Sequence, residues 1–196
     1  MTRAAFDNLF ATVGALICAT PELRDFVDWP DAPAFPGVPA LGVPAIPLIT
    51  GLQAAAAAQT APIVEAIKAV ASQAYWQQTY SEAEVGRDFL NRYGWFELVG
   101  PTGHYLSDTM RAYIAFWGEG LHYPMHLHEA EELYYILAGS AEFHAAGQGS
   151  AILRPQDARH HASNQPHAMD THAEPVLTLI LWRGAGLDGN ARMATA

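Results

Sequence analysis

Two histidines that lie one residue apart, His126 and His128, are followed four positions later by Glu132. Alternate residues of a β-strand face the same side, so the two imidazoles would point in one direction. The three residues after His128 would reverse the chain and return the Glu132 carboxylate beside them on the next strand. Imidazole and carboxylate groups are ligands of divalent transition metals. This spacing therefore predicts a metal site, whereas a lone histidine is more often an ordinary core or surface residue.

Aromatic side chains accompany the predicted ligands. Tyr123 precedes the first histidine, and Tyr134 would share a strand face with Glu132. Trp182 ends the last apolar run of the chain. Most aromatic residues in such positions pack in a core. A phenol beside a divalent cation, however, can lose its proton near neutral pH, as metal-bound water does, so both tyrosines are candidates for acid–base chemistry.

The second half of the chain must form the strands that position these groups. From about residue 96, short runs rich in β-branched and aromatic residues alternate with Gly, Pro and polar turns. Many short strands without intervening helices predict a mainly β fold, an antiparallel barrel or sandwich. We expect residues 96–196 to form this barrel.

The first half of the chain has helical patterns and turn signals. We expect a helix over residues 1–27, an extended proline-rich arm over 30–47, and a helix over 52–76 that is interrupted near Pro62. Ser81 and Glu84 have the spacing of a capping box, and Gly94 would end the helix that follows. Residues 1–95 would then be a helical extension packed on the barrel as part of one structural domain.

The composition of the chain limits the kinds of partner and the cellular compartment that we expect for the protein. The net charge is −10 with 10 Lys and Arg residues, which argues against nucleic acid and anionic membranes. Cys18 is the single cysteine, so an intrachain disulfide and a thiolate metal cluster are excluded. The N-terminal pattern lacks a signal-peptide core and no apolar run has transmembrane length, so we expect a cytoplasmic protein. The oligomeric state stays open; a homodimer is allowed, and the proline-rich arm could serve its interface.

The ligand stretch resembles the first signature motif of the cupin barrels, which are double-stranded β-helices of the jelly-roll type. The matching positions are Gly120, His126, His128, Glu132 and Gly139. A second cupin motif supplies one more histidine from a facing strand. Residues 149–164 fit that motif through Gly149, Pro155, His160 and Asn164, but Asp157 stands where the motif has glycine.

His167 is a second candidate for the fourth ligand. It follows Pro166 and leads toward the final apolar strand, whereas His160 and His161 would lie in a longer loop. A strand holds a ligand more tightly than an irregular loop does, so we favour His167 over His160.

The chain also resembles one cupin family, the cupin-type dimethylsulfoniopropionate lyases of the DddQ family, over roughly residues 73–184. The stretches that carry the resemblance are HYPMHLHEAEELYYILAGSAEF, WQQTY, FLNRYGWFELVG, PHAM and LWRG. The resemblance implies a divalent ion such as zinc, iron or manganese, with four protein ligands, His126, His128, Glu132 and His167. It further implies that Tyr134 is the catalytic base, that Tyr123 is a second phenol in the pocket, and that Trp182 lines it.

The implied reaction is a carbon–sulfur lyase reaction on a small zwitterionic sulfonium. The metal would bind the carboxylate of dimethylsulfoniopropionate, a phenolate would remove the adjacent proton, and dimethyl sulfide would leave acrylate behind. Aromatic faces would hold the sulfonium by cation–π attraction. Two alternatives stay open from the residues alone. One is another cupin metalloenzyme, such as an iron-dependent dioxygenase, and the other is a metal-stabilised binding module without turnover.

Overall fold

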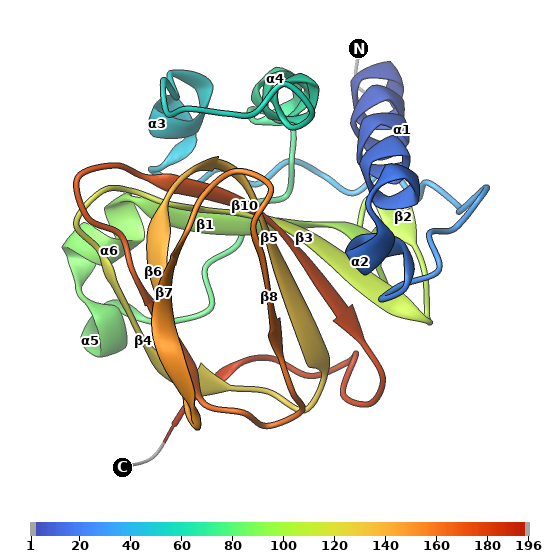
Figure 1. Cartoon of the computed structure of the whole chain (residues 1–196). Helices are drawn as coiled ribbons and strands as arrows, with labels where there is room; N and C mark the ends of the chain where they lie inside the picture. Colours follow the sequence, from blue (N-terminus) through green and yellow to red (C-terminus); the bar gives the residue numbers. More distant parts are fainter. Residues whose placement is uncertain (1–2, 195–196) are drawn as a thin grey trace.

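The computed structural model describes residues 3–194 and shows a β-barrel with a layer of helices on one side (Figure 1). The helices are α1 (Arg3–Ala19), α2 (Pro21–Arg24), α3 (Ile46–Thr50), α4 (Ala61–Val70), α5 (Glu82–Val85) and α6 (Arg87–Asn91). The strands are β1 (Tyr93–Gly100), β2 (Tyr105–Leu106), β3 (Met110–Trp117), β4 (His122–Leu127), β5 (Glu131–Gly139), β6 (Ala141–Ala145), β7 (Gln148–Leu153), β8 (Ala158–His161), β9 (His167–Asp170), β10 (Val176–Arg183) and β11 (Arg192–Met193). The predicted mainly β fold with an N-terminal helical layer is confirmed.

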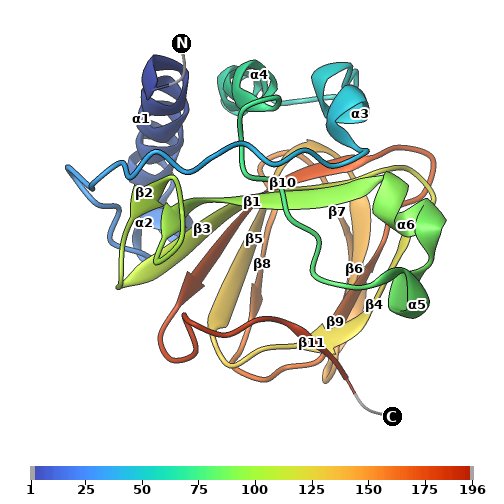
Figure 2. The same ribbon diagram turned by 180° about the vertical axis from the view of Figure 1, so that it is seen from behind.

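Two sheets face each other across the barrel. One has the strand order β2-β1-β3-β10-β5-β8, and the other has the order β11-β4-β9-β6-β7. All strand pairs are antiparallel except β1 with β2. In both views the two sheets enclose an interior between them (Figures 1 and 2).

The central strands of the larger sheet are buried on both faces. Along β5, Leu133, Tyr135 and Leu137 pack against the helices, whereas Tyr134 and Ile136 belong to the apolar cluster inside the barrel. The same alternation continues along the neighbouring strand β10. Because both faces are covered, these strands appear in the sequence as continuous apolar runs. The alternation also fixes which side chains reach the interior, where the candidate site lies.

The helical layer packs on the outer face of that sheet, mainly through α1 and α4. Two contacts fix α1 to β2 and the loop before it: the Phe6 ring stacks on His104 with 4.1 Å between centroids, and the Tyr105 hydroxyl donates to Asp7 at 2.7 Å. His104 is buried at 1% exposure, and its Nε2 accepts a hydrogen bond from the Tyr75 N–H. No helix within residues 3–194 combines the length and apolar character needed to cross a membrane.

Several boundaries differ from the sequence expectations. The first helix stops at Ala19, because Pro21 starts a separate turn of helix. Residues 52–60 form turns and a single bridge, and the helix begins at Ala61 with a proline in its first turn, a position that tolerates the missing N–H. The capping box of Ser81 and Glu84 is confirmed. Gly94 does not end a helix; it lies in β1, which already starts at Tyr93.

Candidate metal centre and pocket

The histidines and the carboxylate come from both sheets. His126 lies on β4 and His167 opposite it on β9, where the two residues are paired in register. Glu132 lies on β5 in the facing sheet, and His128 lies in the crossing between the sheets. Glu132 thus returns beside His128 on the next strand, as expected, but that strand pairs in the facing sheet and not with β4. The groups converge because the chain crosses from one sheet to the other within four residues.

Each of the three histidines is held by a hydrogen bond from its Nδ1 to a main-chain carbonyl. His126 donates to Pro124 at 2.8 Å, His128 to Ala130 at 2.9 Å, and His167 to Gln165 at 2.8 Å. A carbonyl oxygen can only accept, so Nδ1 carries the proton in each ring and Nε2 is left free. This arrangement is typical of histidines that ligate a metal through Nε2.

Three ligand atoms meet at one buried point. Nε2 of His128 lies 3.2 Å from Glu132 Oε2, and Nε2 of His167 lies 3.0 Å from the same oxygen. These three atoms are buried, and none has a hydrogen-bond partner of acceptable geometry. Buried polar atoms are rarely left without partners. A cation shared by the two nitrogens and the oxygen would satisfy all three atoms, so the residues fit a bound metal ion.

His126 stands beside this group. Its ring centroid lies 4.1 Å from that of His167, whereas the compact cluster of possible ligand atoms consists of His128, Glu132 and His167. All four side chains are almost completely buried.

The charges in the centre are set by the same neighbours. Burial alone would raise the pKa of Glu132, but the imidazoles of His128 and His167 hold it well below its usual range. Burial would lower the pKa of His128, but the Glu132 carboxylate raises it above its usual value. Burial and the neighbouring His167 hold the pKa of His126 well below 6.5. The centre therefore presents an ionised carboxylate and a neutral His126 imidazole, which are the forms that bind metals.

Trp182 orients the carboxylate. Its indole Nε1–H donates to Glu132 Oε1 at 2.8 Å, which leaves Oε2 for the centre. The indole also packs on the His128 ring with 4.2 Å between centroids. Trp182 thus fixes two of the candidate ligands, in addition to lining the pocket as predicted.

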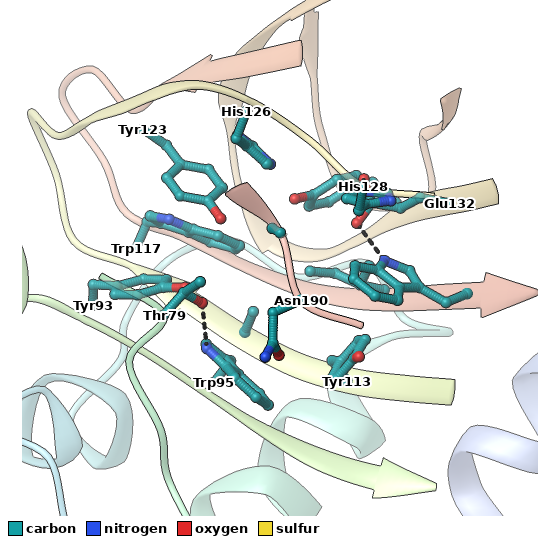
Figure 3. A pocket seen from close by; sticks show the side chains of 15 residues that line it. Thr79, Tyr93, Trp95, Tyr113, Trp117, Tyr123, His126, His128, Glu132 and Asn190 are labelled. Carbon is teal, nitrogen blue, oxygen red and sulfur yellow. Dashed lines mark hydrogen bonds and ion pairs between the residues drawn. The ribbon is translucent and has the colours of Figure 1, made fainter. Parts of the chain in front are cut away.

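An aromatic pocket opens beside the metal centre (Figure 3). Tyr123 packs on His126 at 4.2 Å between centroids, and Tyr134 points into the same cavity from β5. Burial, supported by the Glu132 charge, raises the pKa of the Tyr134 phenol well above 10. Burial likewise raises the pKa of Tyr123. The protein groups alone therefore keep both phenols protonated, and a bound dication is the group that would act in the opposite direction.

The other histidines lie elsewhere. His160 is on the surface beside Glu131, and His122 and His144 both contact Asp170 on the outer face of the smaller sheet. The expected loop around His160 and His161 is wrong, because both residues belong to β8, which pairs with β5. His161 is fully buried and stacks on His167 with 4.1 Å between ring centroids.

Several pocket residues were not singled out from the sequence as site residues. The additional lining side chains are Thr79, Tyr93, Trp95, Tyr113, Ala115, Trp117, Ile180, Asn190 and Ala191. The sequence predicted the aromatic residues among them only as core residues, because most aromatic side chains in such positions pack in a core. Thr79 and Asn190 carry no local signal, since they reach the pocket from segments more than 40 residues from the metal-binding stretch.

The two-sheet barrel with histidines and a carboxylate converging inside it is the architecture of a cupin with a metal site. The family described as dimethylsulfoniopropionate lyase matches residues 43–178. The chain belongs to the dimethylsulfoniopropionate lyase family, so the resemblance found in the sequence is confirmed.

Individual relatives agree with this assignment. The dimethylsulfoniopropionate lyase DddQ of Ruegeria pomeroyi is 38% identical over 183 residues, which cover 93% of this chain and 91% of that protein. The crystal structure of DMSP lyase DddQ from Ruegeria pomeroyi DSS-3 matches with a TM-score of 0.94 at 36% identity, covering 98% of each chain. A chain from the crystal structures of the DMSP lyases RdDddP and RnDddQII matches with a TM-score of 0.96 at 44% identity, covering 98% of this chain and 99% of that one.

Proposed function

We propose that this protein cleaves dimethylsulfoniopropionate to dimethyl sulfide and acrylate by metal-dependent β-elimination. The observation that carries the proposal is the set of three buried, unpartnered ligand atoms beside a pocket walled by aromatic rings and two phenols. Membership of the lyase family supports the same reaction. The substrate is a small zwitterion with a carboxylate at one end and a dimethylsulfonium group at the other.

His126, His128, Glu132 and His167 are the proposed ligands of one divalent ion, with zinc, iron and manganese as the candidates for these nitrogen and oxygen donors. When bound, the ion supplies Lewis acidity toward the substrate carboxylate and a positive charge that favours a nearby phenolate. The chain contributes the fixed tautomers of the histidines and the Trp182 hydrogen bond that aims Glu132.

Tyr134 is the proposed base for the proton on the carbon next to the substrate carboxylate. It shares a strand and a face with Glu132 and lines the pocket, so its hydroxyl is aimed at the same space. Tyr123, across the cavity on β4, is proposed to orient the substrate. The rings of Tyr113, Trp117 and Trp182 exclude water and offer faces that attract a sulfonium cation.

The electron balance requires no further co-substrate. The proton leaves the carbon next to the carboxylate, the C–H electron pair forms the double bond of acrylate, and the C–S bond electrons depart with dimethyl sulfide. The leaving group is uncharged, so it needs no general acid. The proton is retained by the base and is then released to solvent.

The test is headspace detection of dimethyl sulfide, together with acrylate in solution, after dimethylsulfoniopropionate is added to purified protein loaded with each metal. We expect turnover that is abolished by a chelator, restored by metal, and unchanged under strict anoxia. Dependence on oxygen would favour a dioxygenase, whose two-histidine, one-carboxylate centre the group of His128, Glu132 and His167 could also provide. Metal binding without any turnover would indicate a binding module.

A further inference from the structure

The pocket is electrically asymmetric. Among the described residues that line it, Glu132 is the only carboxylate, and it lies at the metal centre. From there the rings of Trp182, Tyr113 and Trp95 follow one another edge to face, with 5.3 Å between each pair of neighbouring centroids. The end of the pocket far from the metal is therefore aromatic and uncharged.

Two polar groups at this far end bond to each other, and a third, on Asn190, stands apart from them. The Thr79 hydroxyl accepts from the Trp95 indole N–H at 3.0 Å and bonds with the Tyr93 hydroxyl at 3.1 Å. Asn190 is exposed to solvent at the rim of the pocket, and its side-chain amide has no hydrogen-bond partner within residues 3–194. In Figure 3 this amide lies on the side of Trp95 and Tyr113, away from His128 and Glu132.

Asn190 belongs to a segment that closes the open end of the barrel. After β10 the chain crosses from the larger sheet to the smaller one, which it joins as β11, as Figure 2 shows. There Met193 pairs with His126, and the Ala194 N–H donates to the Met125 carbonyl at 2.9 Å. The segment 184–191 is thus tied at its end to the strand that carries a proposed metal ligand.

Arg111 clamps the same segment just before Asn190. Its Nη1 donates to the carbonyls of Leu187 at 2.7 Å and Gly189 at 3.1 Å. The guanidinium lies 5.0 Å from the Tyr113 ring centroid, which places Gly189 and its neighbour Asn190 at the aromatic end. Its Nη2 donates to Glu97 Oε2 at 2.7 Å, and both side chains are buried. Glu97 neutralises the positive charge of Arg111, so a cation can bind nearby with little repulsion.

We propose that Asn190 is a further substrate-contacting residue, whose amide oxygen faces the cationic end of the substrate, and that Arg111 is the residue that positions it. The inference rests on the proposed function, because a carboxylate held at the metal centre directs the cation toward the opposite end of the pocket. A neutral amide suits this place, since the negative end of its dipole attracts a cation and its desolvation costs less than that of a carboxylate.

Two substitutions of similar size test which substrate end Asn190 contacts. Asn190→Leu removes the dipole and should raise the KM for dimethylsulfoniopropionate about five- to ten-fold, with a smaller effect on kcat, the scale of one lost polar contact. Asn190→Asp adds a negative charge and should lower the KM at low ionic strength. If the amide N–H instead served the substrate carboxylate, Asn190→Asp would raise the KM above that of Asn190→Leu, and the inference would be overturned. A KM within two-fold of wild type for Asn190→Leu would overturn it as well.

Binding measurements separate this inference from the proposed reaction. The probes are trimethylsulfonium, which has the cation alone, and 3-(methylthio)propionate, which has the carboxylate alone, each titrated by calorimetry into metal-loaded protein. Asn190→Asp should tighten binding of the cation and leave that of the carboxylate unchanged. These titrations do not require turnover, so a wild-type protein that releases no dimethyl sulfide would defeat the proposed function and still leave Asn190 testable. An unchanged cation affinity in both Asn190 variants would defeat the inference.

The positioning role of Arg111 is tested by Arg111→Lys, which keeps the charge but loses the planar fork that holds the two carbonyls through Nη1 and Glu97 through Nη2. It should weaken the cation probe about as much as Asn190→Leu does, with metal content and carboxylate-probe affinity unchanged. Equal weakening of both probes would show a merely structural role. Asp188→Asn is the matched control, because it changes the charge two residues before Asn190; Asp188 lines a second cavity that also touches Asn190, but it does not line the aromatic pocket. It should leave the KM within two-fold; a change as large as that of Asn190→Asp would attribute both effects to general electrostatics.

Discussion

The metal-binding capacity of the centre depends on which ring nitrogen of each histidine carries the proton. In each of the three histidines, a carbonyl fixes the proton on Nδ1 and thereby leaves Nε2 for the centre. The sequence could predict the residues, because His126, His128 and Glu132 are close in the chain and their spacing is diagnostic. It could not predict the tautomers, because those depend on carbonyls whose directions the fold decides.

Tyr134→Phe should reduce turnover by orders of magnitude and leave metal content near that of wild type. The substitution keeps the ring and its packing on Phe143 but removes the ionisable oxygen. Initial rates of dimethyl sulfide release, with metal content from elemental analysis, check this expectation. Tyr123→Phe should cost less, because that phenol is proposed only to orient the substrate. A Tyr134→Phe variant with a rate close to wild type would transfer the role of base to Tyr123.

His167→Ala should lose most of the bound metal, whereas His160→Ala should retain it. The His167 Nε2 lies 3.0 Å from the Glu132 carboxylate, but His160 is on the surface beside Glu131. The two variants are matched controls for each other and are compared by metal content after dialysis. Activity should follow metal content. Loss of metal from His160→Ala alone would show that the second cupin motif, and not β9, supplies the ligand.

At the scale of elements, the strands were easier to predict than their partners. The apolar runs of β5 and β10 and the start of β9 at His167 could be predicted, because burial on both faces gives long apolar stretches. The pairing of β5 with β8 and β10 could not, because it joins residues up to about 50 positions apart through contacts that leave no local pattern. The sequence of β8 predicted a loop, because β8 is an edge strand and such a strand can carry polar residues such as Arg159 and His160.

The ion pair between β1 and β3 should be important for stability. Arg111 and Glu97 are buried and bonded at 2.7 Å, so removing one partner leaves the other charge uncompensated. Arg111→Met or Glu97→Gln should therefore lower the free energy of unfolding by about 3–5 kcal/mol each. The double variant should lose clearly less than the sum of the two. Urea denaturation of all four proteins measures this coupling; strictly additive losses would show that the pair does not act as a unit.

At the scale of the whole molecule, the helical layer and the barrel share one apolar core. Phe6, Leu9 and Val13 of α1 are buried in the same cluster as Leu133 and Leu177 of the sheet. A helical layer on the barrel could be predicted, because helices with an apolar face need cover. Its anchoring through His104 could not be predicted, since that residue lies in a loop and meets α1 only after docking. Because His104 is buried against α1, we expect the docking of the helices to depend on pH.

Acidification should weaken the folded state through His104. Burial lowers the pKa of this imidazole from 6.5 to about 4. Between these two values the unfolded chain binds a proton that the folded protein excludes, so stability is full above about pH 6.5 and declines as the pH falls toward 4. The helical layer should be lost first, because the imidazole stacks on Phe6 of α1. Urea unfolding from pH 7 to pH 4 measures the decline.

His104→Phe supplies the control for this pH effect. It keeps an aromatic ring against Phe6 but cannot take up a proton, and it leaves the Tyr75 N–H without its acceptor. His104→Phe should therefore be less stable than wild type at pH 7 but lose less stability on acidification. The slope of its unfolding free energy against pH should be smaller than that of wild type by the equivalent of up to about one bound proton. Part of the decline in stability with falling pH should persist in the metal-free protein. The reason is that burial also lowers the pKa of His161, to about 3. A His104→Phe slope identical to that of wild type would show that groups other than His104 cause the acid sensitivity.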